Sequence, residues 1–297
     1  MTTWLSLAIL AQALSAVSTF VDRYILTHGK GIGSPLTYAF YVSLLSGFVV
    51  VLLPFGVISW PSAEVIKLSL LMAVFFIFSL FLLYSALKEG KASDVMPVVA
   101  AFSAIASLVL AHSYLDENLP KLFIFSVILF ILGTALISRF RFTHRSIMLT
   151  VGAGLLFGAS AFIVKLIFLE TTFWDGFFWS RMANVLGAGM LLLWPGNVAA
   201  IFKGGRSSNH GTKWLLIGNK TLSGIAGVLT FFAISMGSVS VVNALSGLQF
   251  AFLLLFAFLF VGHFPKALHA EVDRHGLTHK IFGVAVIMIG ILVLYIA

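Results

Sequence analysis

The stretch Ala86-Leu-Lys-Glu-Gly-Lys-Ala-Ser-Asp-Val95 recurs 147 residues later as Ala233-Ile-Ser-Met-Gly-Ser-Val-Ser-Val-Val242, with four identities in ten positions. Two further matches follow in the same order along the chain: residues 14–25 match residues 156–167, and residues 121–128 match residues 280–287. Chance explains three ordered matches poorly, whereas an internal duplication produces them directly. We therefore predict that the chain consists of two related halves.

The composition places both halves in a membrane. The chain has 18 Lys and Arg and 10 Asp and Glu among 297 residues, which is 9% charged, where a soluble chain carries about 25%. This composition excludes a water-soluble enzyme and a disordered chain, and the absence of cysteine excludes a disulfide scaffold. The net charge of +8 falls mostly in short connectors, so it does not indicate the basic face of a nucleic-acid-binding protein.

Ten apolar runs are each close to the length of about 20 residues that a helix needs to cross a bilayer. They cover residues 4–26, 34–53, 65–87, 94–113, 122–138, 147–168, 176–195, 214–235, 240–262 and 281–296. Continuous apolar runs predict helices, because every backbone N–H in lipid must be paired within its own segment. All six tryptophans lie at or beside a predicted helix end, where the headgroups begin. The predicted fold is therefore an all-α integral membrane protein with ten transmembrane helices.

The boundaries of the two halves follow from this helix count. Residues 1–138 hold the first five predicted helices, residues 139–146 form a basic connector, and residues 147–297 hold the second five. Because five is odd, the second repeat enters the membrane from the opposite side and is inverted relative to the first. Inverted repeats are a recurrent architecture of secondary transporters, with the substrate site near the midplane between the repeats. We therefore expect a transporter that works by alternating access.

Two connectors carry a family resemblance. The segment Tyr84-Ser-Ala-Leu-Lys-Glu-Gly-Lys-Ala-Ser-Asp-Val-Met-Pro97 and the acidic turn Tyr114-Leu-Asp-Glu-Asn-Leu-Pro120 resemble the EamA-like branch of the drug/metabolite transporter superfamily. Arg181 resembles an arginine frequent at this place in that family. The second acidic turn is replaced by Val261-Gly-His-Phe-Pro265, where the chain departs from the pattern. The resemblance implies a ten-helix carrier of small metabolites, commonly an exporter, and does not identify the solute.

Polar side chains within the apolar runs are the candidates for solute contact, because such groups face a cavity, a partner helix or one another. Gln249 stands out, since its amide has up to four hydrogen-bonding sites; an interhelical hydrogen bond explains it equally well. The serines also fit plain helix packing, and Tyr84 fits either stacking on a solute or packing. The candidates are Ser18, Tyr84, Ser103, Ser160, Lys165, Arg181, Asn184, Asn219, Lys220 and Gln249.

Charge suggests the solute class. Three cations lie within predicted spans, and no carboxylate is expected at comparable depth, because Asp22 and the other acidic residues lie near predicted helix ends. Lys165 and Arg181 are close enough to an end to reach the headgroups, whereas Lys220 lies about two turns inside its helix. A cavity with cations and amides favours an anionic or zwitterionic metabolite, such as an amino acid or organic acid.

Small residues and the long polar loop suggest no ligand site. Gly154 and Gly158, like Ser43 and Gly47, have the four-residue spacing that lets helices approach closely. Residues 263–279 contain histidines and acids without the spacing of a closed metal site, and no phosphate-binding loop is present. We expect no cofactor and no enzyme activity, because no nucleophile, base or metal cluster is predicted at depth.

The expected partners are the lipid bilayer of the cell (inner or plasma) membrane, a small solute and, as an open alternative, a proton. A monomer is expected, with a homodimer as the alternative. A different class, a lipid-intermediate flippase subunit or a non-catalytic scaffold, would be favoured by a greasy cavity open to lipid. Orientation stays open: 14 of the 18 Lys and Arg fall on the face opposite the termini, which predicts external termini, whereas the resemblance implies cytoplasmic ones.

Overall fold

The computed structural model describes residues 2–28, 33–90, 92–115, 120–137, 143–193, 195–259 and 277–296. The acidic residues 116–119, the basic residues 139–142 of the predicted connector and most of the polar loop of residues 263–279 lie outside this part of the chain. Every regular element among the described residues is a helix. The α-helices and two 3₁₀ helices are α1 (Thr2–His28), α2 (Pro35–Leu45), η1 (Ser46–Phe55), α3 (Ala63–Glu89), α4 (Ala92–Leu115), α5 (Lys121–Ile137), α6 (His144–Glu170), α7 (Phe173–Leu191), α8 (Pro195–Ser207), α9 (His210–Met236), α10 (Val239–Ala244), η2 (Leu245–Gly247), α11 (Leu248–Leu259) and α13 (Leu277–Ile296).

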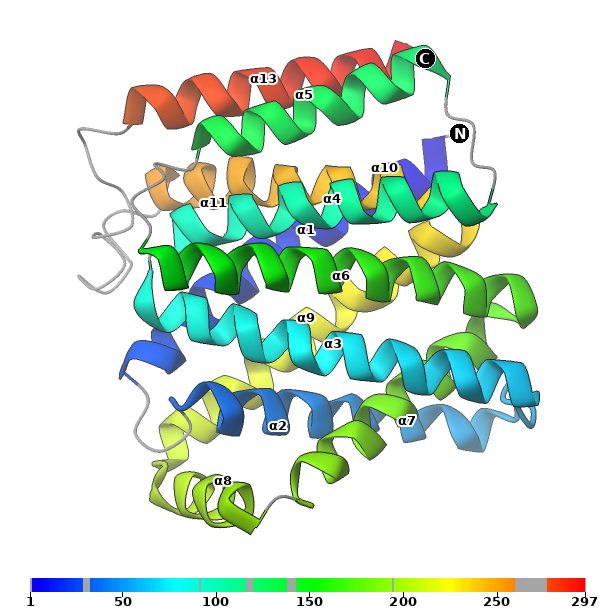
Figure 1. Ribbon diagram of the computed structural model, residues 1–297, viewed down its shortest axis with the longest axis vertical. Coiled ribbons are helices and arrows are strands. Elements are labelled where there is room, and N and C mark those ends of the chain that lie inside the picture. The colour runs from blue at the N-terminus through cyan, green and yellow to red at the C-terminus, as the bar shows by residue number, and fades with distance from the viewer. Residues whose placement is uncertain are drawn as a thin grey trace.

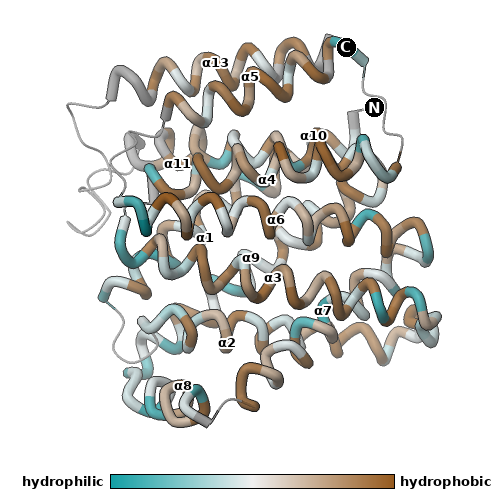
Figure 2. Tube along the Cα trace, in the orientation of Figure 1, coloured by the Kyte–Doolittle hydropathy of each residue, from teal (hydrophilic) through white to brown (hydrophobic). Residues whose placement is uncertain are grey.

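The long helices run back and forth along one direction, and α1 begins at the same end of the bundle at which α13 ends (Figure 1). Apolar residues dominate their length (Figure 2). Within the described part of the chain, six helices are long and apolar enough to cross a membrane, counting α2 and η1 as one. The bent pair α7–α8 is a seventh if it forms one span. Shorter apolar helices occupy the places of the remaining predicted spans, at Ile124–Leu136, Val239–Leu253 and Ile281–Gly290. The protein is thus an all-helical, multi-pass membrane protein, and the ten crossings stay a prediction.

The starts of five helices are fixed by side chains that satisfy unpaired backbone N–H groups. In each case the oxygen of a Ser, Thr or Asn accepts a hydrogen bond from the N–H three residues along the chain, which is the usual N-cap arrangement. These N-caps are Ser62 of α3, Thr143 of α6, Thr172 of α7, Asn209 of α9 and Ser238 of α10.

Helix α8 was not predicted, because residues 196–213 have the polar composition of a connector. The helix starts at Pro195, a position where the missing N–H of proline does no harm, and it is bent by 108° from α7. Ile201 is fully buried against Phe40 and Ala188, so one apolar face docks on the bundle. Its mixed composition distinguishes it from the long helices in Figure 2.

The two stretches that match in sequence also have the same local structure. Gly90 ends α3 with extended backbone (φ −124°, ψ 167°), and Gly237 ends α9 in the same way (φ −128°, ψ −170°). The N–H of each glycine donates to the carbonyl four residues earlier, Ala86 at 2.8 Å and Ala233 at 2.9 Å. A new helix follows within three residues in both places. The resemblance at residues 86–95 and 233–242 is therefore structural as well as chemical.

A second correspondence ties the first helix of each half to its third. The Arg23 guanidinium donates to the carbonyl of Leu87 at 3.3 Å, and the Lys165 ammonium donates to the carbonyl of Ile234 at 3.0 Å. The sequence matches pair Arg23 with Lys165 and Leu87 with Ile234. In both halves a cation thus neutralises the negative end of a helix dipole.

The contacts between the two halves also form corresponding pairs. Helix α1 packs on α9, and the corresponding helices α6 and α3 pack on each other; α5 packs on α13, its own counterpart. This is the pattern that a twofold relation between repeats produces. The duplication and the inversion of the repeats across a membrane both stay predictions.

Two glycines let α6 lie directly on α4. A Cβ added at Gly154 would be 2.7 Å from the carbonyl oxygen of Val99, and one added at Gly158 would be 2.7 Å from the Cβ of Ala106. Real Cβ atoms do not approach so closely, so these contacts need glycine. The predicted close approach at the Gly154 and Gly158 spacing is therefore present.

Gly158→Ala is expected to lower the melting temperature of the purified protein, because overpacking at such a contact costs about 1–3 kcal/mol. Gly224 on α9 is the matched control, since an added Cβ there meets nothing within 4 Å. Gly224→Ala should leave the melting temperature unchanged or raise it slightly, because alanine is the better helix former by about 1 kcal/mol. Equal melting temperatures for the two variants, measured in detergent, would contradict the packing of α6 on α4.

Candidate functional site

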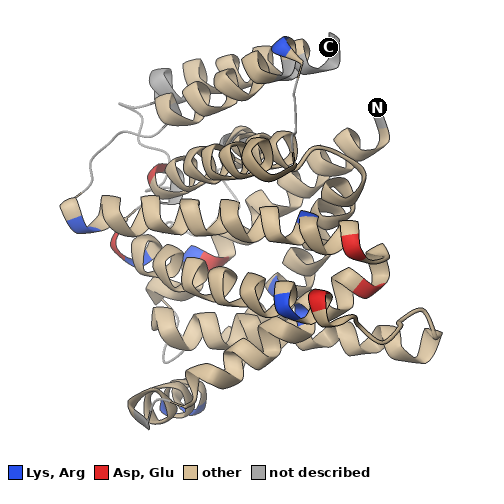
Figure 3. Ribbon diagram, turned by 45° about the vertical axis from the view of Figure 1, so that its right-hand side comes forward, with Lys and Arg blue, Asp and Glu red and all other residues tan. Residues whose placement is uncertain are grey.

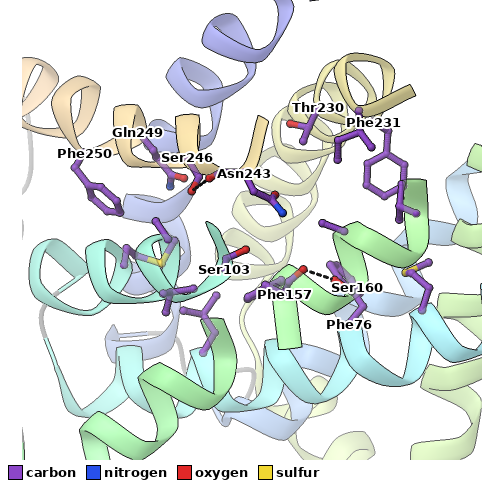
Figure 4. A pocket seen from close by; sticks show the side chains of 18 residues that line it. Phe76, Ser103, Phe157, Ser160, Thr230, Phe231, Asn243, Ser246, Gln249 and Phe250 are labelled. Carbon is purple, nitrogen blue, oxygen red and sulfur yellow. Dashed lines mark hydrogen bonds between the residues drawn. The ribbon is translucent and has the colours of Figure 1, made fainter. Parts of the chain in front are cut away.

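A cavity of about 230 Å³ lies where the two halves meet. Its walls come from α3 and α4 of the first half and from α6, α9, α10, η2 and α11 of the second (Figure 4). Twelve of its eighteen lining residues are apolar, among them Phe76, Phe157, Phe231 and Phe250. The cavity therefore lies between the predicted repeats, where the transporter architecture places a substrate.

The polar lining groups are hydroxyls and amides, and no described residue of the lining is charged. Three of the hydroxyls donate to carbonyls three or four residues earlier: Ser160 to Phe157 at 2.8 Å, Thr230 to Ala226 at 2.9 Å and Ser246 to Asn243 at 2.6 Å. The Asn243 Nδ2 is buried and has no hydrogen-bond partner among the described residues. The full polar set is Ser103, Ser160, Thr230, Asn243, Ser246 and Gln249.

An interruption of the ninth predicted span places three of these groups at the cavity. The six-residue helix α10 passes into the 3₁₀ helix η2 and then into α11, so the helix changes pitch at residues 245–247. Asn243, Ser246 and Gln249 all lie at this interruption and line the cavity. Short 3₁₀ stretches within helices often mark functional hinges.

Gln249 combines both roles that its sequence position allowed. Its Nε2 donates to the carbonyl of Ser15 at 3.2 Å and to the hydroxyl of Thr19 at 2.5 Å, which joins α11 to α1. Its Oε1 makes no hydrogen bond within the described chain, and the side chain lines the cavity. The amide is therefore anchored at one atom and available at the other.

The structure brings together three of the ten candidate residues, Ser103, Ser160 and Gln249, at the cavity. The others lie elsewhere. Ser18, Tyr84, Asn219 and Lys220 lie at the contact of α1 with α9, whereas Arg181 and Asn184 lie on α7.

The expectation that no carboxylate lies at the depth of Lys220 is wrong. The Lys220 Nζ is 2.6 Å from the Asp22 Oδ1, and both side chains are largely buried, 8% and 13% exposed. Asp22 also accepts hydrogen bonds from Asn219 at 2.6 Å and Tyr38 at 2.5 Å, and Lys220 lies over the ring of Tyr84. Helix α1 continues to His28, beyond the predicted end, so Asp22 is more than a turn inside it. Charged residues are sparse along the helices (Figure 3).

Arg181 has no such counterion. Its guanidinium carbon is 4.1 Å from the ring centroid of Phe231 and 5.7 Å from that of Phe76, both of which line the cavity. The Nε is buried without a hydrogen-bond partner, and no ion pair to Arg181 exists within the described residues. One turn along α7, Asn184 is fully buried with both amide atoms unpartnered. These two side chains share one helix face.

Residues 2–139 match the model of the EamA-like transporter family. The first half of the chain is therefore similar to the EamA-like transporter family. This family is part of the drug/metabolite transporter superfamily, whose members are membrane transporters and not enzymes. A crystal structure that is 16% identical, covering 96% of this chain and 98% of its own, superposes with a TM-score of 0.63 and shows the same fold. No curated protein matches the chain.

Lys165, a further candidate residue, has a structural role. Its ammonium donates to the carbonyls of Ile234 at 3.0 Å, Ser235 at 3.4 Å and Gly237 at 2.9 Å, at the end of α9. The cation therefore stabilises a helix end and does not line the cavity.

Three cavity residues were missed by the sequence analysis: Asn243, Ser246 and Thr230. A signal was available for Asn243, which interrupts the apolar run Val239–Leu245 with an amide. Thr230 carried no such signal in the sequence. A buried threonine can donate to a carbonyl of its own helix, and the Thr230 hydroxyl does so with Ala226.

The same substitution at two buried asparagines should have opposite effects on stability. Asn184→Leu should leave the melting temperature unchanged or raise it, because it removes two polar atoms that lack partners. Asn219→Leu should lower stability by about 1–3 kcal/mol, because Asn219 donates to Asp22 and to the carbonyl of Ser18. Thermal unfolding of both variants in one detergent is the measurement, and a large loss for Asn184→Leu would show that its amide has a structural partner.

Proposed function

We propose that the protein is a secondary transporter that exports a small anionic or zwitterionic metabolite, such as an amino acid or organic acid, across the cell membrane by alternating access. The single observation that carries the solute class is Arg181, a buried guanidinium without a counterion in the described chain, next to the cavity. Lys220 and Lys165 no longer contribute to this argument, because both cations have partners.

The cavity volume favours a small solute. Pockets for drug-sized ligands occupy roughly 300–1,000 Å³, and this cavity of about 230 Å³ is smaller. It accommodates a metabolite rather than a lipid with its acyl chains. Four phenylalanines in the lining favour a solute that has an apolar part.

Phe231 connects the cavity to the charge. Its side chain lines the cavity, and its ring also contacts Arg181, whose guanidinium carbon is 4.1 Å from the ring centroid. Rotation of the ring exposes the guanidinium to a bound carboxylate, which pairs with arginine through two parallel hydrogen bonds. The unpaired Oε1 of Gln249 is an acceptor for an ammonium group at the opposite wall.

A second candidate is transport of a lipid intermediate, favoured by the apolar majority of the lining. A lipid would have to leave its chains in the bilayer and insert only its headgroup, because the cavity volume excludes the whole molecule. The two candidates differ in whether transport is detected with water-soluble solutes or with labelled lipids.

The deciding experiment is a solute screen in proteoliposomes. Uptake and efflux of amino acids, organic acids, organic cations and neutral sugars are compared with and without a pH gradient, alongside translocation of fluorescent phospholipids. The proposal expects transport of an acidic or zwitterionic solute and none of the organic cations. Lipid translocation alone would establish the second candidate.

Arg181→Gln is expected to reduce transport of that solute tenfold or more, because a hydrogen-bonded charge pair contributes about 1.5–3 kcal/mol. Arg181→Lys should retain part of the activity, since it keeps the charge and loses the paired geometry. The matched control is Arg145→Gln, which removes a largely exposed arginine that pairs with Glu89 at 3.5 Å. Unchanged transport by Arg181→Gln would remove the anionic and zwitterionic assignment.

A further inference from the structure

We infer that the outward face of α8 binds the headgroups of anionic phospholipids at one surface of the membrane. No described residue of α8 lines the cavity, so this surface is separate from the site proposed for the solute. The lipid contact requires only a multi-pass membrane protein and does not depend on which solute the protein carries.

The position of α8 along the chain puts it at a membrane surface. Helix α7 has 19 residues and is therefore about 28 Å long, close to the thickness of a hydrocarbon core, so it reaches across without α8. The bend of 108° makes α8 run across the direction of the long helices, at the end of the bundle where α1 and α3 end and α9 begins (Figure 1). In the second turn of α9, Trp214 is 70% exposed, as is typical of rings at the level of the headgroups.

The inner face of α8 is fixed to the bundle. Ile201 and Gly204, one turn apart, are buried, and Ile201 packs against Phe40 of α2. Gly205 lies directly on Tyr41 of α2, since an added Cβ there would be 2.9 Å from the Tyr41 Cζ. These contacts set the rotation of α8 about its axis and leave its opposite face outside the bundle.

The outward face of α8 combines one aromatic ring with two cations. Phe202 is 49% exposed, and Lys203 and Arg206 are exposed beside it. Their spacing of three and four residues places the three side chains on one helix face. A helix with basic residues and an exposed aromatic ring is typical of those that lie in the plane of the membrane interface. Lys213, in the first turn of α9, adds a third cation nearby.

These cations have no counterion in the described chain. Residues 176–270 contain no Asp or Glu, and no ion pair or hydrogen bond from Lys203 or Arg206 exists among the described residues. Other exposed cations are paired, as Lys67 is with Glu64 and Arg145 is with Glu89. In Figure 3, the helix at the lower left is α8, which carries blue and no red. The outward face therefore presents a net positive charge.

An anionic phospholipid matches both parts of this face. Its phosphate carries the negative charge that Lys203 and Arg206 lack, and its glycerol and acyl region receives the ring of Phe202. A small soluble anion would use the cations and leave the ring in water. A zwitterionic lipid offers no net charge, so the preference is for lipids such as phosphatidylglycerol.

The first test measures which lipids gather at α8. The chain has no cysteine, so Ala199→Cys places a single thiol for a donor fluorophore on the exposed face of α8. The protein is placed in phosphatidylcholine nanodiscs with a trace of phosphatidylglycerol or phosphatidylcholine, each carrying the same acceptor on an acyl chain. Energy transfer to phosphatidylglycerol is expected to be severalfold higher, with up to about fivefold enrichment from each cation. The excess should fall between about 0.1 M and 1 M salt, because screening shortens from about 10 Å to about 3 Å.

Charge variants identify the residues responsible. Lys203→Gln combined with Arg206→Gln should lower transfer to the phosphatidylcholine level, whereas Lys203→Arg combined with Arg206→Lys should retain the preference. Lys67→Gln, at the other end of α3, is the matched control and should also retain it. Equal transfer to the two lipids in the wild-type background, or a preference that survives loss of both cations, overturns the lipid site. Inorganic phosphate that abolishes the preference at constant ionic strength would indicate a free-anion site and also overturns it.

A second test measures the depth of α8. Quenching of the label at Ala199→Cys should be stronger with a nitroxide on the lipid headgroup than with one at the end of the acyl chain. Ile225→Cys, near the middle of α9 and 52% exposed, is the matched control and should show the opposite order. Stronger quenching of the α8 label by the chain-end nitroxide, or no quenching by either, overturns the interfacial position. Neither test uses a solute, so a failure of the proposed transport function leaves both results standing.

Discussion

The cost of an unpaired polar group in a bilayer governs this structure. Backbone groups avoid that cost by forming helices, and the buried side-chain amides and cations mostly avoid it through specific partners. Lys165 binds carbonyls at the end of α9, Gln249 binds α1, and Lys220 binds Asp22. Against this background the exceptions carry information. Arg181 and Asn184 have buried polar atoms without partners in the described chain, and they share one face of α7 close to the cavity wall.

The predicted duplication provides an internal reference for interpreting single residues. Where both halves use the same device, as with Gly90 and Gly237 at the helix ends, the device belongs to the scaffold. Where they differ, the difference requires a separate explanation. The residues that correspond to Asp22 and Lys220 are Val164 and Ala73, which are apolar and buried.

The sequence predicts the membrane class and most helices well, because long apolar runs have one stable solution in lipid. It also identifies Ser103, Ser160 and Gln249, since polar groups in mid-span must face something other than lipid. It fails where a partner is distant in the chain: Asp22 lies 198 residues from Lys220, and spacing within one helix says nothing about that contact. Helix α8 is missed because its sequence is mostly polar. The sequence alone does not show that its Ile201 packs against Phe40 and Ala188.

In the proposed function, Arg181 is what lets an uncharged cavity select a charged solute. A cation stacked on aromatic rings gains about 0.5–2 kcal/mol, whereas removing it from water costs several kcal/mol. Stacking on the rings of Phe231, Phe177 and Phe76 therefore offsets only part of the cost of removing the guanidinium from water. A carboxylate that reaches Arg181 supplies the missing counterion, and its binding free energy depends on the movement of Phe231. An organic cation gains nothing from that movement and meets repulsion. Under this proposal, the same charge without a counterion provides both selectivity and a reason for the site to rearrange when the solute binds.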